Sequence, residues 1–181
     1  MTKSLLFSNI YSIITMNSSN EKFSRIYDEY IDKIYRFVYL KVNSQEIAED
    51  ITSKVFLSGW ESYEKNQEIN NIGAFLYKIA RNNVIDYYRE KDRTKMVSAD
   101  FADQISDKVN LHEKAIFNAD IELVKSAINN INNKDHQDVL IWHYLEDMPI
   151  TEISEILNKP AGTIRVMIHR GLRSLKDELR G

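Results

Sequence analysis

The 181-residue sequence contains no cysteine, two prolines and five glycines. The lack of cysteine excludes disulfide bonds, thiolate zinc sites and thiol catalysis, and it fits a reducing compartment, so we expect a cytoplasmic protein. With so few helix-breaking residues and no strictly alternating run, the chain is expected to be nearly all helical. The apolar stretch near the N-terminus is too short to cross a bilayer and lacks an evident cleavage site, so we expect no membrane insertion.

Hydrophobic spacing of three and four residues predicts a first helical domain over residues 21–92, preceded by an N-terminal tail over residues 1–20. Whether translation begins at Met16 is left open by the sequence. The clearest periodicity runs from Ile72 to Val84, and Asn43 or Ser44 is expected to begin the helix before it. We predict three helices, over residues 23–42, 44–63 and 72–90.

Weak hydrophobic spacing and mixed charges predict a flexible linker over residues 93–118. A second small domain over residues 119–181 would begin with a helix around residues 121–131 and continue with one over residues 135–145, which Pro149 ends. Two last helices are joined by the segment "NKPAG", and this pair predicts a helix-turn-helix. The fold class is therefore all-α, with two small helical domains and a helix-turn-helix in the second.

The last helix carries basic residues and no acid between residues 158 and 176. Helical geometry places Ile168, Leu172 and Leu175 on one side and Arg170 and Arg173 roughly opposite. An outer face with arginines suits the DNA major groove, because arginine binds guanine O6 and N7 with two hydrogen bonds and also neutralises phosphate. The plainer alternative is a solvated helix with cations near its C-terminal dipole.

Charge is separated by sign within the second domain, although the whole chain has a net charge of -3. Residues 118–157 contain eight acidic and two basic residues, whereas residues 158–181 contain six basic and two acidic ones. The domain is therefore expected to present one face to an anionic partner.

The third helix of the first domain combines cations with aromatic rings opposite its apolar stripe. This face contains Tyr77, Lys78, Arg81, Tyr88 and Arg89, with Asn82 at its edge. Such a face suits single-stranded or melting DNA, because cations follow the phosphates while rings stack on exposed bases. An ordinary amphipathic surface is the alternative.

Together, the segments "AEDITSKVFLSGW", "AFLYKIARNNVIDYYRE" and "ITEISEILNKPAGTIRVMIHRGLRSLK" resemble the extracytoplasmic-function (ECF) group of sigma factors of bacterial RNA polymerase. The resemblance implies a non-catalytic factor without cofactor or metal. Its implied partners are core RNA polymerase, promoter DNA and an anti-sigma factor. It would direct promoter recognition and DNA melting.

The resemblance also implies three groups of site residues. Recognition of the minus-thirty-five element would involve Thr163, Arg165, Val166, His169, Arg170 and Arg173. Recognition of the minus-ten element would involve Tyr63, Asn66, Lys78, Arg81, Asn82, Tyr88 and Arg89. Docking on core polymerase would involve Asp50, Ser53, Phe56, Leu57 and Trp60.

Some positions depart from the family pattern. Ser53 and Lys54 replace a common Gln-Glu pair, and Val166 and Met167 replace a common Ser-Arg pair, so that thymine methyl groups become their expected contacts. Pro149 replaces a common capping serine, and Thr151 is expected to cap the helix instead.

Other classes of function were weighed against the sigma factor. An autonomous helix-turn-helix regulator would use the second domain equally well but would leave the basic aromatic face of the first domain unused. A purely structural interaction module is a further alternative. An enzyme is disfavoured, because His136 and His143 have no accompanying metal-binding motif and the glycines form no phosphate-binding loop.

Overall fold

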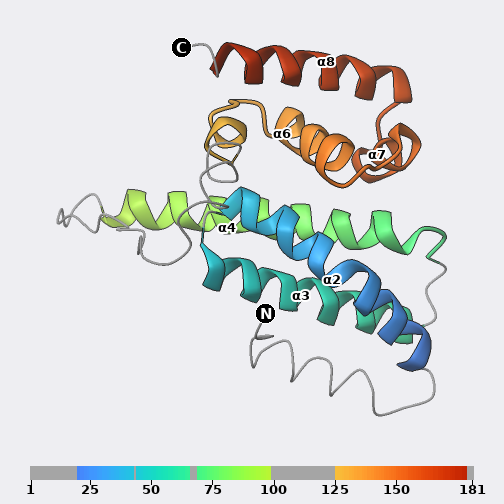
Figure 1. Cartoon of the computed structure of the whole chain (residues 1–181). Helices are drawn as coiled ribbons and strands as arrows, with labels where there is room; N and C mark the ends of the chain where they lie inside the picture. The colour runs from blue at the N-terminus through green and yellow to red at the C-terminus, as the bar shows by residue number, and fades with distance from the viewer. Residues whose placement is uncertain (1–19, 43, 66–68, 99–124, 179–181) are drawn as a thin grey trace, which may run out of the picture.

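The computed structural model describes residues 20–42, 44–65, 69–98 and 125–178 (Figure 1). Every regular element within these residues is helical, which confirms the predicted all-α class. The elements are α2 (Asn20–Val42), α3 (Gln45–Glu64), α4 (Ile72–Ser98), α6 (Lys134–Leu140), η1 (Ile141–Leu145), α7 (Ile150–Leu157) and α8 (Ala161–Glu178). Helices α2, α3 and α4 form what we call the N-terminal bundle, and α6, η1, α7 and α8 form the C-terminal bundle.

The N-terminal bundle buries the apolar faces that the hydrophobic spacing predicted. Phe23, Tyr27 and Phe37 of α2 and Phe56 of α3 are almost completely buried. The rings of Tyr27 and Phe56 lie edge to face with centroids 4.8 Å apart. Burial of each such side chain stabilises the fold by about 1.5–3 kcal/mol.

Side chains cap the N-termini of three of the helices. Ser44 caps α3 by accepting a hydrogen bond from the backbone N–H of Ile47 at 3.4 Å. Asn71 accepts one from the N–H of Ala74 at the start of α4, and Asn133 caps α6 in the same way. These caps satisfy N–H groups that lack partners inside the helix.

A helix-turn-helix is present in the C-terminal bundle, as predicted, and is formed by α7 and α8. Helix α7 ends at Leu157, and the next residue, Asn158, adopts the left-handed conformation with φ 51°. The hydroxyl of Ser154 donates a hydrogen bond to the carbonyl oxygen of Lys159. Thr151 does not cap α7, because Pro149 occupies the N-cap position without a side-chain hydrogen bond. Proline suits this position because its ring fixes φ, and because the helix does not use a backbone N–H of the N-cap residue.

Two predicted boundaries differ from the structure. Helix α4 continues to Ser98, past the predicted start of the linker at residue 93, because glutamate, lysine and arginine sustain a helix beyond its last buried residue. The helix predicted over residues 135–145 is divided into α6 and the π-helix η1. Most of the predicted linker, residues 99–118, and the predicted tail over residues 1–19 lie outside the described residues.

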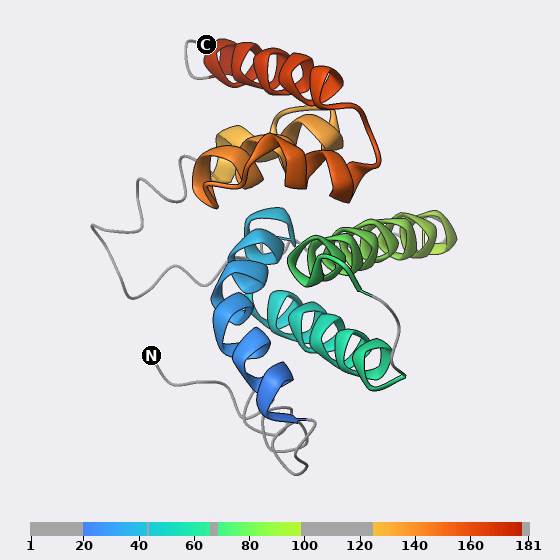
Figure 2. The ribbon, with the colours of Figure 1, turned by 90° about the vertical axis from the view of Figure 1, so that its right-hand side faces the viewer.

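The two bundles pack against each other, which the sequence did not predict. Figure 2 shows α6 and α7 above α2 and α4, and α8 above α6 and α7, farthest from the N-terminal bundle. The indole of Trp142 in η1 is completely buried and contacts the rings of Phe37 and Tyr77 from the N-terminal bundle. A single hydrophobic core therefore extends through both bundles.

Candidate nucleic-acid interface

Helix α8 presents a basic surface to solvent. All six residues predicted to contact the minus-thirty-five element are exposed: Thr163, Arg165, Val166, His169, Arg170 and Arg173. The opposite face of α8 is buried through Ile164, Met167 and Ile168. The geometry thus leaves the basic side chains accessible while the apolar side fixes the helix to the bundle.

Two expectations for α8 were wrong. Met167 was predicted to contact DNA, but it is buried in the core, whereas its neighbour Val166 is exposed. Leu172 was placed on the apolar side with Ile168 and Leu175, but it is 39% exposed. Gly171 is buried in its place and lies where a Cβ atom would come within 3.1 Å of Leu140, so the absence of a side chain lets α8 approach α6 closely.

Helix α4 exposes only part of its predicted basic and aromatic face. Lys78, Asn82 and Arg89 are exposed. Tyr77 was predicted to lie on this face, but its side chain is buried against Phe37 and Trp142. Burial raises the pKa of the Tyr77 phenol well above its usual range.

Arg81, at the centre of this face, is engaged by the C-terminal bundle. Its Nη2 lies 2.5 Å from a carboxylate oxygen of Asp135, and its Nε lies 2.9 Å from one of Asp138. Both acids belong to α6, and Asp138 is almost fully buried. Arg81 therefore has two carboxylate partners in this arrangement, at its Nε and Nη2 atoms.

The side chain of Tyr88 also contacts residues of other helices. Its hydroxyl donates a hydrogen bond of 2.5 Å to the carbonyl oxygen of Lys41. The Lys134 ammonium lies 5.3 Å from the centroid of its ring, within range of a cation–π contact. These contacts join α4 to α2 and α6.

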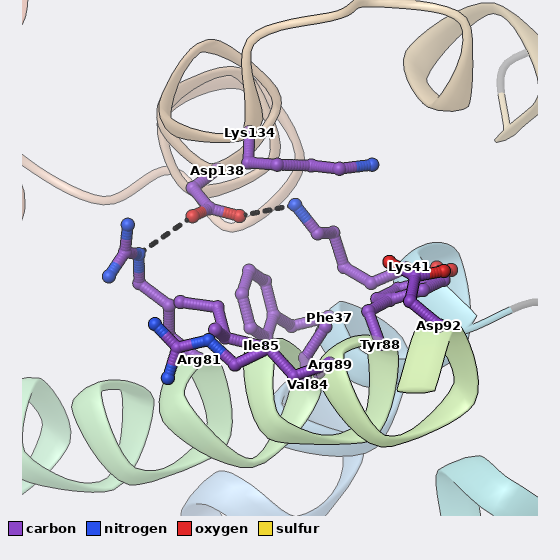
Figure 3. Close-up of a pocket in the computed structure, with 10 residues that line it drawn as sticks. All are labelled: Phe37, Lys41, Arg81, Val84, Ile85, Tyr88, Arg89, Asp92, Lys134 and Asp138. Atoms are coloured by element: carbon purple, nitrogen blue, oxygen red, sulfur yellow. Dashed lines mark hydrogen bonds and ion pairs between the residues drawn. The ribbon is translucent and has the colours of Figure 1, made fainter. Parts of the chain in front are cut away.

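A buried lysine completes the ionic part of the interface between the bundles. The Nζ of Lys41 lies 2.6 Å from a carboxylate oxygen of Asp138 (Figure 3). It also lies 2.8 Å from the amide oxygen of Gln137. Burial lowers the pKa of Lys41, although Asp138 acts in the opposite direction. Asp138 thus bridges Lys41 and Arg81, beside a cavity of about 170 Å³ lined also by Phe37 and Tyr88.

Further polar contacts join the bundles through side chains of α2 and of the segment before α4. Arg36 of α2 donates two hydrogen bonds of 2.7 Å to the carboxylate of Glu146, which follows η1. Asn71 donates one to Glu155 of α7. The interface therefore combines a buried aromatic centre with ion pairs around it.

The residues predicted to dock on core polymerase do not form one exposed surface. Phe56 is completely buried, and Ser53 and Trp60 are nearly so. The rings of Phe56 and Trp60 contact Tyr27 and Phe23 of α2 in the bundle core. Their predicted role in docking stays a prediction, and in this structure their side chains are buried. Asp50 is exposed and pairs with Lys54 at 2.7 Å, while Leu57 is 45% exposed.

The stretch from the end of α3 to the start of α4, which contains the predicted minus-ten residues Tyr63 and Asn66, is described except at residues 66–68. Tyr63 is half-buried, and its ring lies 5.5 Å from that of Phe23 and 6.4 Å from that of Trp60. Asn66 lies outside the described residues. On α4, Arg89 pairs with Asp86 at 3.3 Å, and both side chains are exposed.

Sequence reasoning missed the residues that join the bundles. Lys41, Asp135, Asp138 and Trp142 were not considered as parts of a site. One signal was present in the sequence, since the acidic excess of residues 118–157 complements the basic face of α4. In the part of the chain that the structure describes, no helix is long and apolar enough to span a membrane, and no three potential metal-ligating residues cluster.

Two helical bundles, one of which exposes a basic recognition helix, define a DNA-binding transcription protein. The model of sigma-70 region 2 matches residues 26–94, and that of sigma-70 region 4 matches residues 133–175. The sequence is 30% identical to the ECF RNA polymerase sigma factor SigW of Bacillus subtilis, in a match that covers 88% of this chain and 90% of SigW. It is 23% identical to SigM of the same bacterium, with 83% of this chain and 91% of SigM covered. The chain belongs to the ECF sigma factors of the sigma-70 family.

A solved structure has a similar fold across both bundles. It is the sigma factor RpoE in complex with the anti-sigma factor NepR from Bartonella quintana, with a TM-score of 0.72 at 19% identity. The match covers 88% of this chain and 98% of RpoE.

Proposed function

We propose that this chain binds core RNA polymerase and directs it to promoters by reading the minus-thirty-five element with α8 and the minus-ten element with the N-terminal bundle. It would also assist DNA melting and carry no catalytic activity of its own. The exposed basic face of α8 is the main structural observation behind this proposal. Membership of the sigma-70 family favours polymerase dependence over an autonomous regulator.

The proposed contacts of α8 follow from the chemistry of its exposed side chains. Arg165 and Arg170 suit guanine in the major groove, since a guanidinium can donate two hydrogen bonds to O6 and N7. Val166 suits a thymine methyl group, and Arg173 suits a phosphate. Thr163 and His169 complete the same surface and can donate hydrogen bonds to bases or phosphates.

The N-terminal bundle would contact single-stranded DNA through α4. Lys78, Asn82 and Arg89 are accessible in the described arrangement. Arg81 and Tyr88 would join them once the C-terminal bundle releases this face. Cations alternating with a ring can follow the phosphates and stack on an unpaired base. Tyr63 and Asn66, at the loop before α4, would contribute to the same element.

Docking on core polymerase is proposed for the exposed part of α3. Asp50 and Leu57 are its accessible members among the predicted residues, and a carboxylate and an exposed leucine on one helix suit a mixed polar and apolar contact. Phe56 and Trp60 would support this surface from inside the bundle.

An anti-sigma factor is the further proposed partner, in the cytoplasm where the polymerase acts. The support is the structural similarity to RpoE, which is in complex with NepR. Such a partner would control when this chain reaches the polymerase.

In vitro transcription tests the main proposal. Core polymerase from the host, the purified chain and a promoter library are combined, and the transcripts are sequenced. The expected result is enrichment of two short motifs at fixed spacing only when both proteins are present. Sequence-specific binding to duplex DNA by the chain alone, without dependence of initiation on it, would favour an autonomous regulator. The Arg170→Ala variant should lose selection of the upstream motif, whereas Arg25→Ala, at an exposed arginine of α2, should retain it.

A further inference from the structure

The cavity between α2, α4 and α6 combines apolar walls with charged side chains (Figure 3). Its volume is about 170 Å³, and its apolar walls are formed by Phe37, Val84, Ile85 and Tyr88. Four cationic side chains and two carboxylates line the remainder. An apolar space beside charged groups is typical of sites that bind small molecules, because the apolar walls supply contact area and the polar groups fix the orientation of the ligand.

The volume and the walls of the cavity suit one aromatic ring. An apolar cavity of about 150 Å³ can hold a benzene molecule, so this cavity of about 170 Å³ has room for a six-membered ring with one small substituent. The rings of Phe37 and Tyr88 and the aliphatic side chains of Val84 and Ile85 offer apolar contacts to such a ring. Water forms few hydrogen bonds with these walls, so an apolar group displaces it favourably.

One side of the cavity has more positive than negative charge. Figure 3 shows Lys41 and Lys134 on one side of Asp138 and Arg81 on the other. Asp138 is the carboxylate partner of Lys41, and it also pairs with Arg81 at 2.9 Å. Burial lowers the pKa of Lys41, Asp138 acts in the opposite direction, and the charges of Lys134 and Arg81 lower it further. Asp92 also lines the cavity, but in the part of the chain that the structure describes it pairs with neither lysine. The lysine side therefore favours an anionic group.

Both lysines have hydrogen-bond donors left for a ligand. An ammonium group has three N–H donors. Two donors of Lys41 are used by Asp138 at 2.6 Å and by Gln137 at 2.8 Å, so one remains. Lys134 is exposed, lies over the ring of Tyr88 and forms no ion pair with another described residue. Its long, flexible stem lets the ammonium approach a ligand. A carboxylate has two acceptor oxygens and so suits two such groups.

We propose that this cavity is a binding site for a small aromatic carboxylate. The ring of the ligand lies against the apolar walls, and its carboxylate accepts hydrogen bonds from Lys41 and Lys134. The walls favour a ring over a small hydrated anion, and the lysines favour an anion over a neutral ring. The site is separate from the contacts proposed for promoter DNA at α8, and its ligand touches α2, α4 and α6 together.

Titration of benzoate into the isotope-labelled, full-length chain tests the site by NMR. We expect saturable shifts of backbone amide signals around the cavity, in residues 81–92 of α4 and 134–138 of α6. Benzyl alcohol keeps the ring and lacks the charge, whereas acetate keeps the charge and lacks the ring. Each should bind at least about tenfold more weakly than benzoate, because each loses one of the two contributions. The absence of saturable shifts, or equal affinity for benzoate and either analogue, would overturn the proposal.

Two variants of the full-length chain test which side chains form the site. Lys134→Gln should weaken benzoate binding at least about tenfold, because it removes a charged donor. Ile85→Trp should fill the cavity and abolish binding, with circular dichroism showing that the variant is folded. Lys22→Gln is the matched control, because Lys22 is an exposed lysine of α2 that does not line the cavity, and it should bind benzoate as the wild type does. Undiminished binding in Lys134→Gln or in folded Ile85→Trp would overturn the site, and the first variant decides if the second does not fold.

Discussion

Trp142 of η1 stacks on Phe37 of α2, with ring centroids 5.3 Å apart and an interplanar angle of 18°. Both side chains are completely buried, although the two residues belong to different bundles. Tyr77 of α4 meets the same indole edge to face. One side chain of the C-terminal bundle thus contacts two helices of the other bundle, and it is the aromatic centre of their interface.

Replacing Trp142 should strongly destabilise the packed chain. Trp142→Ala removes a fully buried indole, and we expect the free energy of unfolding to fall by about 3–5 kcal/mol. Tyr144→Ala is the matched control, since Tyr144 lies two residues away and is exposed, and its effect should stay within about 0.5 kcal/mol. Urea denaturation followed by circular dichroism measures both. Similar losses in the two variants would contradict the special position of Trp142.

Two glycines should respond in opposite ways to alanine. At Gly59 a Cβ atom would lie 2.7 Å from Cδ2 of the fully buried Leu76, so Gly59→Ala is expected to destabilise the N-terminal bundle by about 1–3 kcal/mol. At Gly162 a Cβ atom would meet nothing within 4 Å. Gly162→Ala should therefore stabilise the chain by about 0.4–1 kcal/mol, because alanine restricts the unfolded state. Thermal denaturation of both variants measures the difference, and a neutral Gly59→Ala would show that α3 and α4 can move apart.

Arginines of α8 should contribute differently to specificity and to salt dependence. Arg170→Ala is expected to weaken binding to the correct upstream element by about 1–3 kcal/mol relative to a mismatched one. Arg173→Ala, by loss of one phosphate contact, should weaken both sites equally and reduce the slope of log affinity against log salt by about 0.9. Holoenzyme binding to both duplexes at several salt concentrations distinguishes the two effects. The same loss of specificity in both variants would contradict these assignments.

Acid should destabilise the C-terminal bundle through His136. Burial lowers the pKa of His136 below its ordinary value of 6.5, and Arg170 lowers it further while Asp135 acts in the opposite direction. The unfolded chain therefore binds the proton more tightly, so the contribution of His136 to stability is complete above pH 6.5 and decreases as the pH falls towards the folded pKa. An NMR titration should find the His136 pKa below 6.5 and a higher value in Arg170→Ala. An unchanged pKa in that variant would show that the charge of Arg170 does not affect the protonation of the His136 imidazole.

The helices were predictable because their signals are local. The spacing from Ile72 to Val84 and the caps at Ser44 and Asn158 are contained within a few residues of sequence. Phe56 and Trp60 were assigned to a partner surface, and only their contacts with Phe23 and Tyr27 show that they belong to the core. Similarly, the periodicity of α4 could not show that the ring of Tyr77 contacts Trp142, which lies 65 residues later in the sequence.

The interface between the bundles was not predictable from periodicity. Arg81 and its partner Asp135 are 54 residues apart, and no repeat relates them. Charge complementarity was visible in the acidic excess of the second domain, but composition does not select Asp135 and Asp138 among eight acids. The exposed face of α8 was predictable because its arginines, its apolar stripe and the preceding turn all lie in one short segment.

Left-handed residues precede and follow the eight-residue α7, Asp147 with φ 49° and Asn158 with φ 51°. Aspartate and asparagine tolerate this conformation better than most residues, so the backbone turns at both places without glycine. The orientation of α8 is consequently determined by turns and by buried contacts, independently of the side chains that face solvent. Residues such as Arg165 and Val166 can therefore change during evolution without redirecting the helix, which gives related proteins a simple route to new promoter sequences on an unchanged scaffold.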